Sequence, residues 1–189
     1  MAEIAWARTP PRPELVRMVC KALPALGASL RVLARDVLGA EARIDLVATD
    51  PDGRLTLVLI GGGDDDLALV ALALAQRAWV EARLPDWIQL APELGLRADG
   101  SVRVMLVAPA FSAPAVAAVR AADPEDIDLV RYRCLQDGSD TTILLEADRL
   151  AGGRVAPGPA AGPPPGARFR TGLSDADLVL SPAERRGLE

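Results

Sequence analysis

The sequence predicts a mixed α/β domain, in which helices flank a central sheet and a Pro/Gly-rich tail follows. Residues 43–50 and 54–60 are rich in β-branched and aliphatic residues and flank the turn signal DPDG. Two further strand patterns, 101–109 and 127–135, stand on either side of a helical one. With 189 residues, 50% of them hydrophobic, the chain can bury one sizeable core.

The first half of the chain is read as a helix followed by a hairpin. Residues 13–27 carry apolar side chains at helical spacing, and Pro13 suits a first helical turn. Residues 29–39, SLRVLARDVLG, fit either a short helix or a strand, and we expect helix or irregular structure. The run LTLVLI at 55–60 is almost continuously apolar, which predicts a strand covered on both faces.

The second half continues with alternating helices and strands. The aspartates of GGGDDD precede the apolar run 67–84, so we expect them to cap a helix. A short apolar segment follows at 86–95. After the strand at 101–109, a helix is expected to begin at Ser112, and a final hairpin is expected to end with the strand 141–148. This order predicts a mixed sheet between helices.

The composition divides the chain into four parts. We expect an N-terminal extension at 1–12 and the folded domain at 13–150. The Pro/Gly-rich stretch 151–170 reads as a linker that forms no core. Residues 171–189 regain apolar side chains and are expected to be a docking segment or a disordered tail. Those apolar side chains are Leu173, Leu178, Val179 and Leu180.

Composition excludes several classes of function. The chain has no histidine, which rules out a His-based triad and histidine metal ligands. Cys20 and Cys134 are too isolated for a disulfide framework or a zinc site, and we expect buried, unreactive thiols. The net charge of −5 disfavours general nucleic-acid binding. Neither a membrane-spanning run nor a secretion signal is recognised, so we expect a cytoplasmic protein that binds no membrane.

Two groups of residues together resemble a known family. They are RID with DPDGRLTLVLI in the first hairpin, and the later unit VMLVAPAFS followed by IDLVRYRCL. Between them lies the long helix that contains Trp79. Over about residues 14–145 this arrangement resembles the restriction-endonuclease-like, or PD-(D/E)XK, nuclease superfamily, and especially bacterial proteins related to NucS-type endonucleases. The resemblance implies a restriction-endonuclease-like fold.

The resemblance also implies where an active site would lie. In active members an aspartate on one strand, and an acid, a spacer and a lysine on the next strand, hold a divalent cation near the scissile phosphate. Asp45 matches the aspartate, while the acid position falls on Leu59 and the lysine position on Gly61. Neither leucine nor glycine can do that chemistry. A helical glutamate used by some members matches Glu14 weakly. The resemblance therefore implies relic positions at Asp45, Leu59 and Gly61, with no intact catalytic set.

A migrated site stays open as an alternative. Asp64, Asp65 and Asp66 follow the second strand and are near enough in sequence to turn towards Asp45. The favoured interpretation is that they form a solvated cap on the next helix. Lys21 is a second, less favoured replacement for the missing lysine.

Plain structural accounts compete with the functional ones. Asp45 is also explained as a polar residue at a strand end that pairs with Arg43 or Arg54. The glycines 61–63 before a helix suggest a phosphate cradle, but the spacing and the neighbouring aspartates favour a flexible turn.

Side chains on the helices have plain accounts too. Trp79 and Trp87 are expected to pack in the core, with a partner-binding surface as the alternative. Gln76 and Arg77 lie on a helix where superfamily members often carry polar site residues, and we expect them at the surface.

These observations favour a non-catalytic binding or scaffold protein, a pseudoenzyme without cofactor. The alternative is a Mg²⁺- or Mn²⁺-dependent endonuclease or nucleic-acid-binding protein that uses Asp45 with a migrated carboxylate. A protein partner or a second copy of the chain is the expected partner, and nucleic acid is left open. The strand TTILLEA is a candidate sheet edge for pairing across a two-fold axis.

Overall fold

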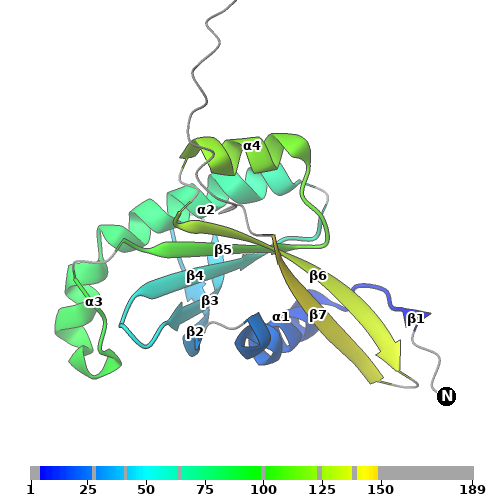
Figure 1. The fold of residues 1–189 in the computed structure, drawn as a ribbon. Coiled ribbons are helices and arrows are strands. Elements are labelled where there is room, and N and C mark those ends of the chain that lie inside the picture. Colours follow the sequence, from blue (N-terminus) through cyan, green and yellow to red (C-terminus); the bar gives the residue numbers. More distant parts are fainter. Residues whose placement is uncertain are drawn as a thin grey trace, which may run out of the picture. The chain divides into compact units, whose positions relative to one another are not determined.

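A seven-stranded mixed sheet with helices on both faces organises the part of the chain that the structure describes (Figure 1). The structure is a computed structural model, and it describes residues 5–26, 29–40, 42–63, 65–98, 101–122, 125–137 and 140–148. The strands are β1 (Ala5–Trp6), β2 (Arg31–Leu38), β3 (Arg43–Thr49), β4 (Leu55–Ile60), β5 (Arg103–Ala108), β6 (Ile127–Asp137) and β7 (Asp140–Asp148). The helices are α1 (Arg12–Ala22), α2 (Asp66–Glu81), α3 (Leu84–Leu90) and α4 (Ala113–Ala122), with single 3₁₀ turns η1 (Leu23–Leu26) and η2 (Pro92–Leu94). The predicted fold class is confirmed.

The sheet combines a parallel centre with antiparallel flanks. The strands run in the order β1-β6-β5-β4-β3-β2, and β7 pairs with β6. Strands β4, β5 and β6 are parallel neighbours, whereas β2–β3, β3–β4, β6–β7 and β1–β6 are antiparallel. Helices α2 and α4 lie in the connections between the parallel strands, as parallel pairing requires.

The β3–β4 hairpin forms as the sequence predicts, and its turn has a clear local cause. The Asp50 carboxylate accepts hydrogen bonds from the backbone N–H groups of Asp52 (3.0 Å) and Arg54 (2.9 Å). Gly53 has φ of 81°, in the left-handed region that glycine adopts without strain. Every residue of β4 is buried because β3 and β5 flank it and helices cover both faces. The hairpin therefore stands at the centre of the fold.

Two apolar clusters hold the helices to opposite faces of the sheet. Under α2 and α4 pack core residues such as Leu57, Leu59 and Leu106. On the other face, Leu15 and Val19 of α1 pack against alternate residues of the same strands. Figure 1 shows α2 and α4 on one side of the sheet and α1 on the other. A side chain of the central strands therefore contacts either α2 and α4 or α1, depending on the face of the sheet to which it points.

The expectation of helix or irregular structure at 29–39 is wrong, because residues 31–38 form strand β2. Leu33 and Val37 are four residues apart, which fits a helical face and equally one face of a strand. The pairing of β2 with β3 shifts register between Val32 and Ala34, so simple alternation is lost. In the strand, Leu33 and Val37 both pack under the α2 layer. Only the pairing with β3 shows that these residues form a strand and not a helix.

Several elements of the structure have no counterpart among the helices and strands that the sequence predicts. Residues 5–12 contribute β1, which pairs with β6, and the first residue of α1. The segment 84–94 forms α3 and η2, and Trp87 of α3 packs edge-on against Trp79 of α2 with ring centroids 6.3 Å apart. Both indoles pack against the core, as the sequence analysis expects.

The segments 151–170 and 171–189 lie outside the described residues. No helix in the described ranges is long and apolar enough to cross a membrane.

Candidate functional site

Asp45 lies where β3 and β4 begin to separate. The last paired residues of the two strands on this side are Leu46 and Val58. Beyond that pair, Asp45 Oδ2 accepts a hydrogen bond of 2.7 Å from the backbone N–H of Ile60. The Asp45 side chain is only 7% exposed. Asp45 and Leu59 lie on adjacent strands, as the sequence predicts, and the carboxylate bridges the gap between those strands.

The Asp45 carboxylate is bound by Arg12, the first residue of α1. Arg12 Nη2 lies 2.7 Å from Asp45 Oδ1 and 2.9 Å from Oδ2. Arg12 Nη1 donates to the backbone carbonyl oxygen of Ile60 at 2.9 Å. One guanidinium therefore occupies the point on which a carboxylate and a main-chain carbonyl converge. Leu15 and Val19, buried under the sheet, hold α1 in the position that allows this contact.

The pair of Arg12 and Asp45 places a permanent positive charge beside a buried carboxylate. Burial raises the pKa of Asp45, while the hydrogen bond from Ile60 N–H and the charge of Arg12 act in the opposite direction. Arginine stays protonated at all ordinary pH values. Because Arg12 is 59% exposed and Asp45 is buried, the cation approaches the carboxylate from the solvent side.

The acid and lysine positions implied by the resemblance are closed by apolar groups. Leu59 is 1% exposed and packs in the core cluster under α2. A Cβ added to Gly61 would lie 2.8 Å from Cδ2 of Leu69 in α2, so a lysine there requires Leu69 to move. Both positions are thus filled from the α2 layer, whereas Asp45 is bound from α1.

The alternative carboxylates have other contacts or lie elsewhere. Asp65 caps α2 by accepting from Ala68 N–H at 2.9 Å. Asp66 accepts from the backbone N–H of Ser112, which lowers the pKa of Asp66, and from the Ser112 hydroxyl at 3.0 Å. Asp64 lies outside the described residues. Glu14 is exposed on α1, and Lys21 is in the last turn of that helix, at the far end from Arg12.

The described residues do not fit the divalent cation that the nuclease resemblance implies. A Mg²⁺ ion needs oxygen ligands in near-octahedral geometry, usually including one or two carboxylates. Here the convergent oxygens are those of Asp45 and Ile60, and Arg12 already binds both. Within the described ranges no group of three or more acidic or cysteine side chains is placed to hold a metal.

The sequence does not predict that Arg12 is the partner of Asp45. The sequence places residue 12 in the N-terminal extension and offers Arg43 or Arg54 as the partner of Asp45. In the structure Arg43 binds Asp36 (2.7 Å), and Arg54 binds Asp126. The only local signal for Arg12 is its position immediately before Pro13.

The expectation that Gln76 and Arg77 lie at the surface is wrong. Gln76 is fully buried and bonds Ala40 N–H and Ala42 C=O, both at 3.0 Å. The Arg77 side chain is 15% exposed and binds Glu81 and Asp126. A helix face that appears polar in sequence is thus covered by the turn between β2 and β3 and by the loop before β6.

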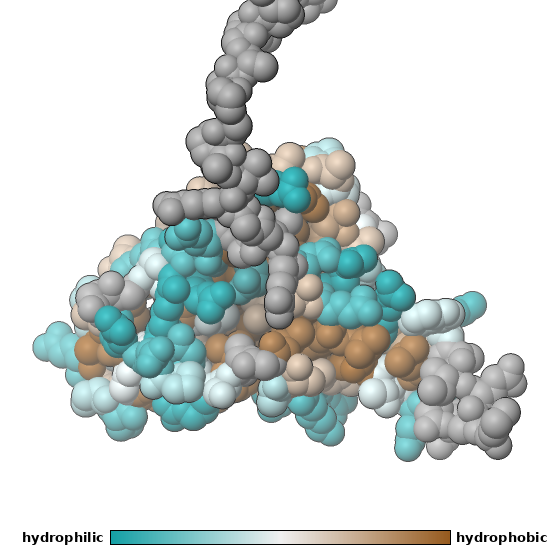
Figure 2. Space-filling model, in the orientation of Figure 1, coloured by the Kyte–Doolittle hydropathy of each residue, from teal (hydrophilic) through white to brown (hydrophobic). Residues whose placement is uncertain are grey.

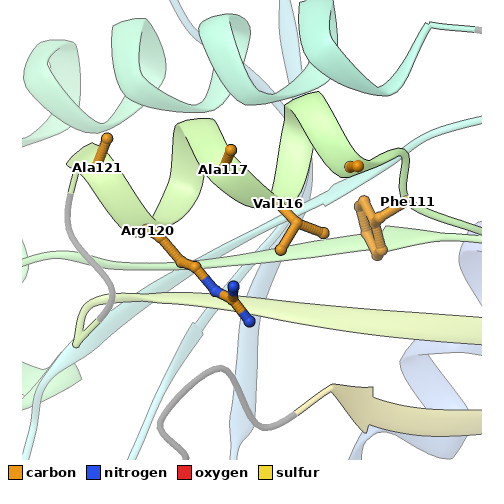
Figure 3. Close-up of a pocket in the computed structure, with 6 residues that line it drawn as sticks. Phe111, Val116, Ala117, Arg120 and Ala121 are labelled. Atoms are coloured by element: carbon orange, nitrogen blue, oxygen red, sulfur yellow. The ribbon is translucent and has the colours of Figure 1, made fainter. Parts of the chain in front are cut away.

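A wide hollow of about 720 Å³ lies beside α4, away from the Asp45 site. In Figure 3 the side chains of Val116 and Arg120 extend from one side of α4, with Phe111 beside them, and Ala117 and Ala121 lie on the other side of the helix. The lining residues are apolar apart from Arg120 and include no carboxylate. This hollow therefore offers no second set of cation ligands.

Removal of Arg12 is expected to affect Asp45 specifically. Arg12→Ala should lower the free energy of unfolding by about 1–2 kcal/mol, because Asp45 and the Ile60 carbonyl lose their partner while water replaces part of the bonding. The pKa of Asp45 should rise further. Urea unfolding and a carboxyl NMR titration measure the two effects. Arg17→Ala, on an exposed part of the same helix, is the control, and equal effects of the two variants would refute the assigned pair.

Solved structures that are similar to this chain share little sequence identity with it. No protein-family model and no curated protein matches the sequence. A repair endonuclease from Pyrococcus abyssi is similar over 66% of this chain and 48% of its own, with 17% identity and a TM-score of 0.46. The EndoMS–dsDNA complex is similar over 62% of this chain and 43% of its own, with 18% identity and a TM-score of 0.41. The chain spans less than half the length of either.

Proposed function

We propose that this chain is a non-catalytic binding module on a nuclease-like fold. The single observation that carries the proposal is the guanidinium of Arg12, which binds both oxygens of Asp45 and the carbonyl oxygen of Ile60. These two groups are the oxygens that converge beside β4, and a hard cation would have to use them. A side-chain cation thus takes the place of a metal ion.

The closed positions on β4 support the same proposal. Phosphodiester hydrolysis needs a group that activates water and a positive charge that stabilises the developing phosphate charge. Leu59 in the apolar core can supply neither, and Gly61 has no side chain. The charge of Arg12 is neutralised by Asp45. The arrangement therefore stabilises the hairpin and α1, and none of these described side chains is left free for the chemistry.

A protein is the partner that the charge distribution favours. The net charge of −5 gives little attraction to a phosphate backbone. Many arginines of the domain are already paired with acids, as in the Arg77–Asp126, Arg103–Asp128 and Arg131–Asp148 pairs. Paired arginines contribute little to the release of counterions from DNA. Binding through an apolar surface fits this composition better.

Metal titration combined with a cleavage assay tests the proposal. We expect the wild-type protein to bind Mg²⁺ or Mn²⁺ no more tightly than millimolar, by calorimetry, and to leave single-stranded, double-stranded and branched DNA intact. Asp45→Asn should change neither result. Cleavage that requires Asp45 would overturn the proposal in favour of the endonuclease alternative, in which Asp64, Asp65 or Asp66 supplies the second carboxylate. Salt-sensitive DNA binding without cleavage would instead identify a nucleic-acid-binding module.

A further inference from the structure

Strand β7 leaves one edge of the sheet open in the described part of the chain. It pairs with β6 over its whole length, from Asp140 opposite Asp137 to Asp148 opposite Leu129. No other described strand pairs with β7. Alternate backbone N–H and C=O groups of a strand point to each side, so half of those in β7 point away from β6. Nine residues of strand extend over about 30 Å, which is long for an edge.

The opposite edge of the sheet, β2, is protected in ways that β7 is not. Strand β2 carries the exposed charges Arg31 and Arg35, a register shift, and Asp36 at φ of 54°. Such features discourage pairing with another strand. Strand β7 has no proline, lysine or register shift. Of its three acids, Glu146 and Asp148 bind arginines of β6, and the exposed Asp140 stands at the first position of the strand.

The middle of β7 is apolar on both faces. Leu144 is 43% exposed on the face away from α1. Ile143 and Leu145 lie on the face towards α1, where a groove of about 420 Å³ runs between Met18, Ala22 and Ile143. Figure 2 shows hydrophobic surface gathered in the region of α1 and β7. An added strand would bury this apolar surface and satisfy the free backbone groups together.

We propose that a second copy of this chain pairs with β7, antiparallel and about a two-fold axis at Leu144. A two-fold axis perpendicular to the sheet keeps each face on its own side, so residues of equal parity meet. Centred on Leu144, the register places Leu144 opposite its own copy and Ile143 opposite Leu145. Thr142 then lies opposite Glu146. The strand is thus complementary to itself, which favours a second copy over an unrelated strand.

The apolar residues select this register over its neighbour. An axis at Ile143 would place Asp140 opposite Glu146 and Thr142 opposite Leu144. The axis at Leu144 places Asp140 opposite Asp148 instead. Glu146 is bound by Arg133 and Asp148 by Arg131, so the charges do not distinguish the two axes. The axis at Leu144 pairs Ile143, Leu144 and Leu145 with one another, whereas the axis at Ile143 places Leu144 and Leu145 opposite threonines. The inference depends on β7 alone and stands whether or not the Asp45 site is catalytic.

Light scattering during size-exclusion chromatography of the full chain tests this inference. We expect twice the chain mass for the wild type and a twofold lower mass for Leu144→Glu. Within one copy the new glutamate faces Arg133, the partner of Leu144 across the β6–β7 pair, while across the axis two glutamates repel. Leu90→Glu, at an 82% exposed leucine on α3, is the matched control and should remain a dimer. Circular dichroism checks that each variant is folded.

Hydrogen exchange locates the interface on the strand. Amides of β7 that point away from β6 should exchange slowly in the dimer and fast in Leu144→Glu. A wild-type monomer at every concentration would overturn the inference. So would a dimer that persists in Leu144→Glu, or one whose β7 amides exchange as fast as those of a free edge.

Discussion

Replacing Leu59 with glutamate is expected to remove most of the stability of the domain at neutral pH. Leu59 is 1% exposed in the cluster under α2. The loss of its packing, together with burial of a carboxylate among apolar side chains, should cost at least about 4 kcal/mol. Small domains have about 5–15 kcal/mol in total. The variant therefore places an acid where the nuclease resemblance requires one and is expected to weaken the fold without creating a metal site.

The stability defect of Leu59→Glu is expected to depend on pH. Burial raises the pKa of a carboxyl group in the folded state above its unfolded value of about 4.3. A raised folded pKa means that the defect is full above the folded pKa and shrinks as the pH falls towards the unfolded pKa. Thermal unfolding across that range, compared with the wild type at each pH, measures it. Leu90→Glu on the surface should show almost no defect, and wild-type stability of Leu59→Glu with Mg²⁺ binding would refute the closed position.

Loss of the Gln76 amide is expected to release the turn between β2 and β3. Gln76 is fully buried, and its amide satisfies Ala40 N–H and Ala42 C=O at 3.0 Å each. Gln76→Ala leaves both backbone groups without their partner and opens a cavity, so we expect a loss of about 2–4 kcal/mol in the free energy of unfolding. Chemical denaturation measures this loss, and Gln89→Ala on the exposed face of α3 is the control.

Gly39 supplies a second, independent test of the same contact. A Cβ at Gly39 would lie 1.8 Å from Oε1 of Gln76, so Gly39→Ala must displace the amide. The double variant with Gln76→Ala should then be less destabilised than the sum of the two single variants, because they remove one shared contact. Additive losses would show that the two positions act separately.

Local patterns determined the elements whose causes lie within a few residues. The DPDG turn needs only Asp50 and Gly53, and the cap of α2 needs only Asp65, so the sequence predicts both. The buried run of β4 likewise announces a strand covered on both faces. Strand β2 is different, because the spacing of Leu33 and Val37 satisfies a helix as well as a strand. The residues form a strand because they pair with β3.

In the candidate site, too, some features follow from the local sequence and others only from the tertiary structure. The sequence by itself determined that Asp45 lies in the hairpin and that residues 59 and 61 carry no side chain able to ligate a metal or stabilise a phosphate. Only the tertiary structure brought Arg12 to Asp45, across 33 residues of sequence. Only the tertiary structure, too, turned Gln76 inwards to a turn that lies 34 to 36 residues away. Such contacts depend on how helices pack on the sheet, and a pattern of neighbouring residues contains no record of that packing.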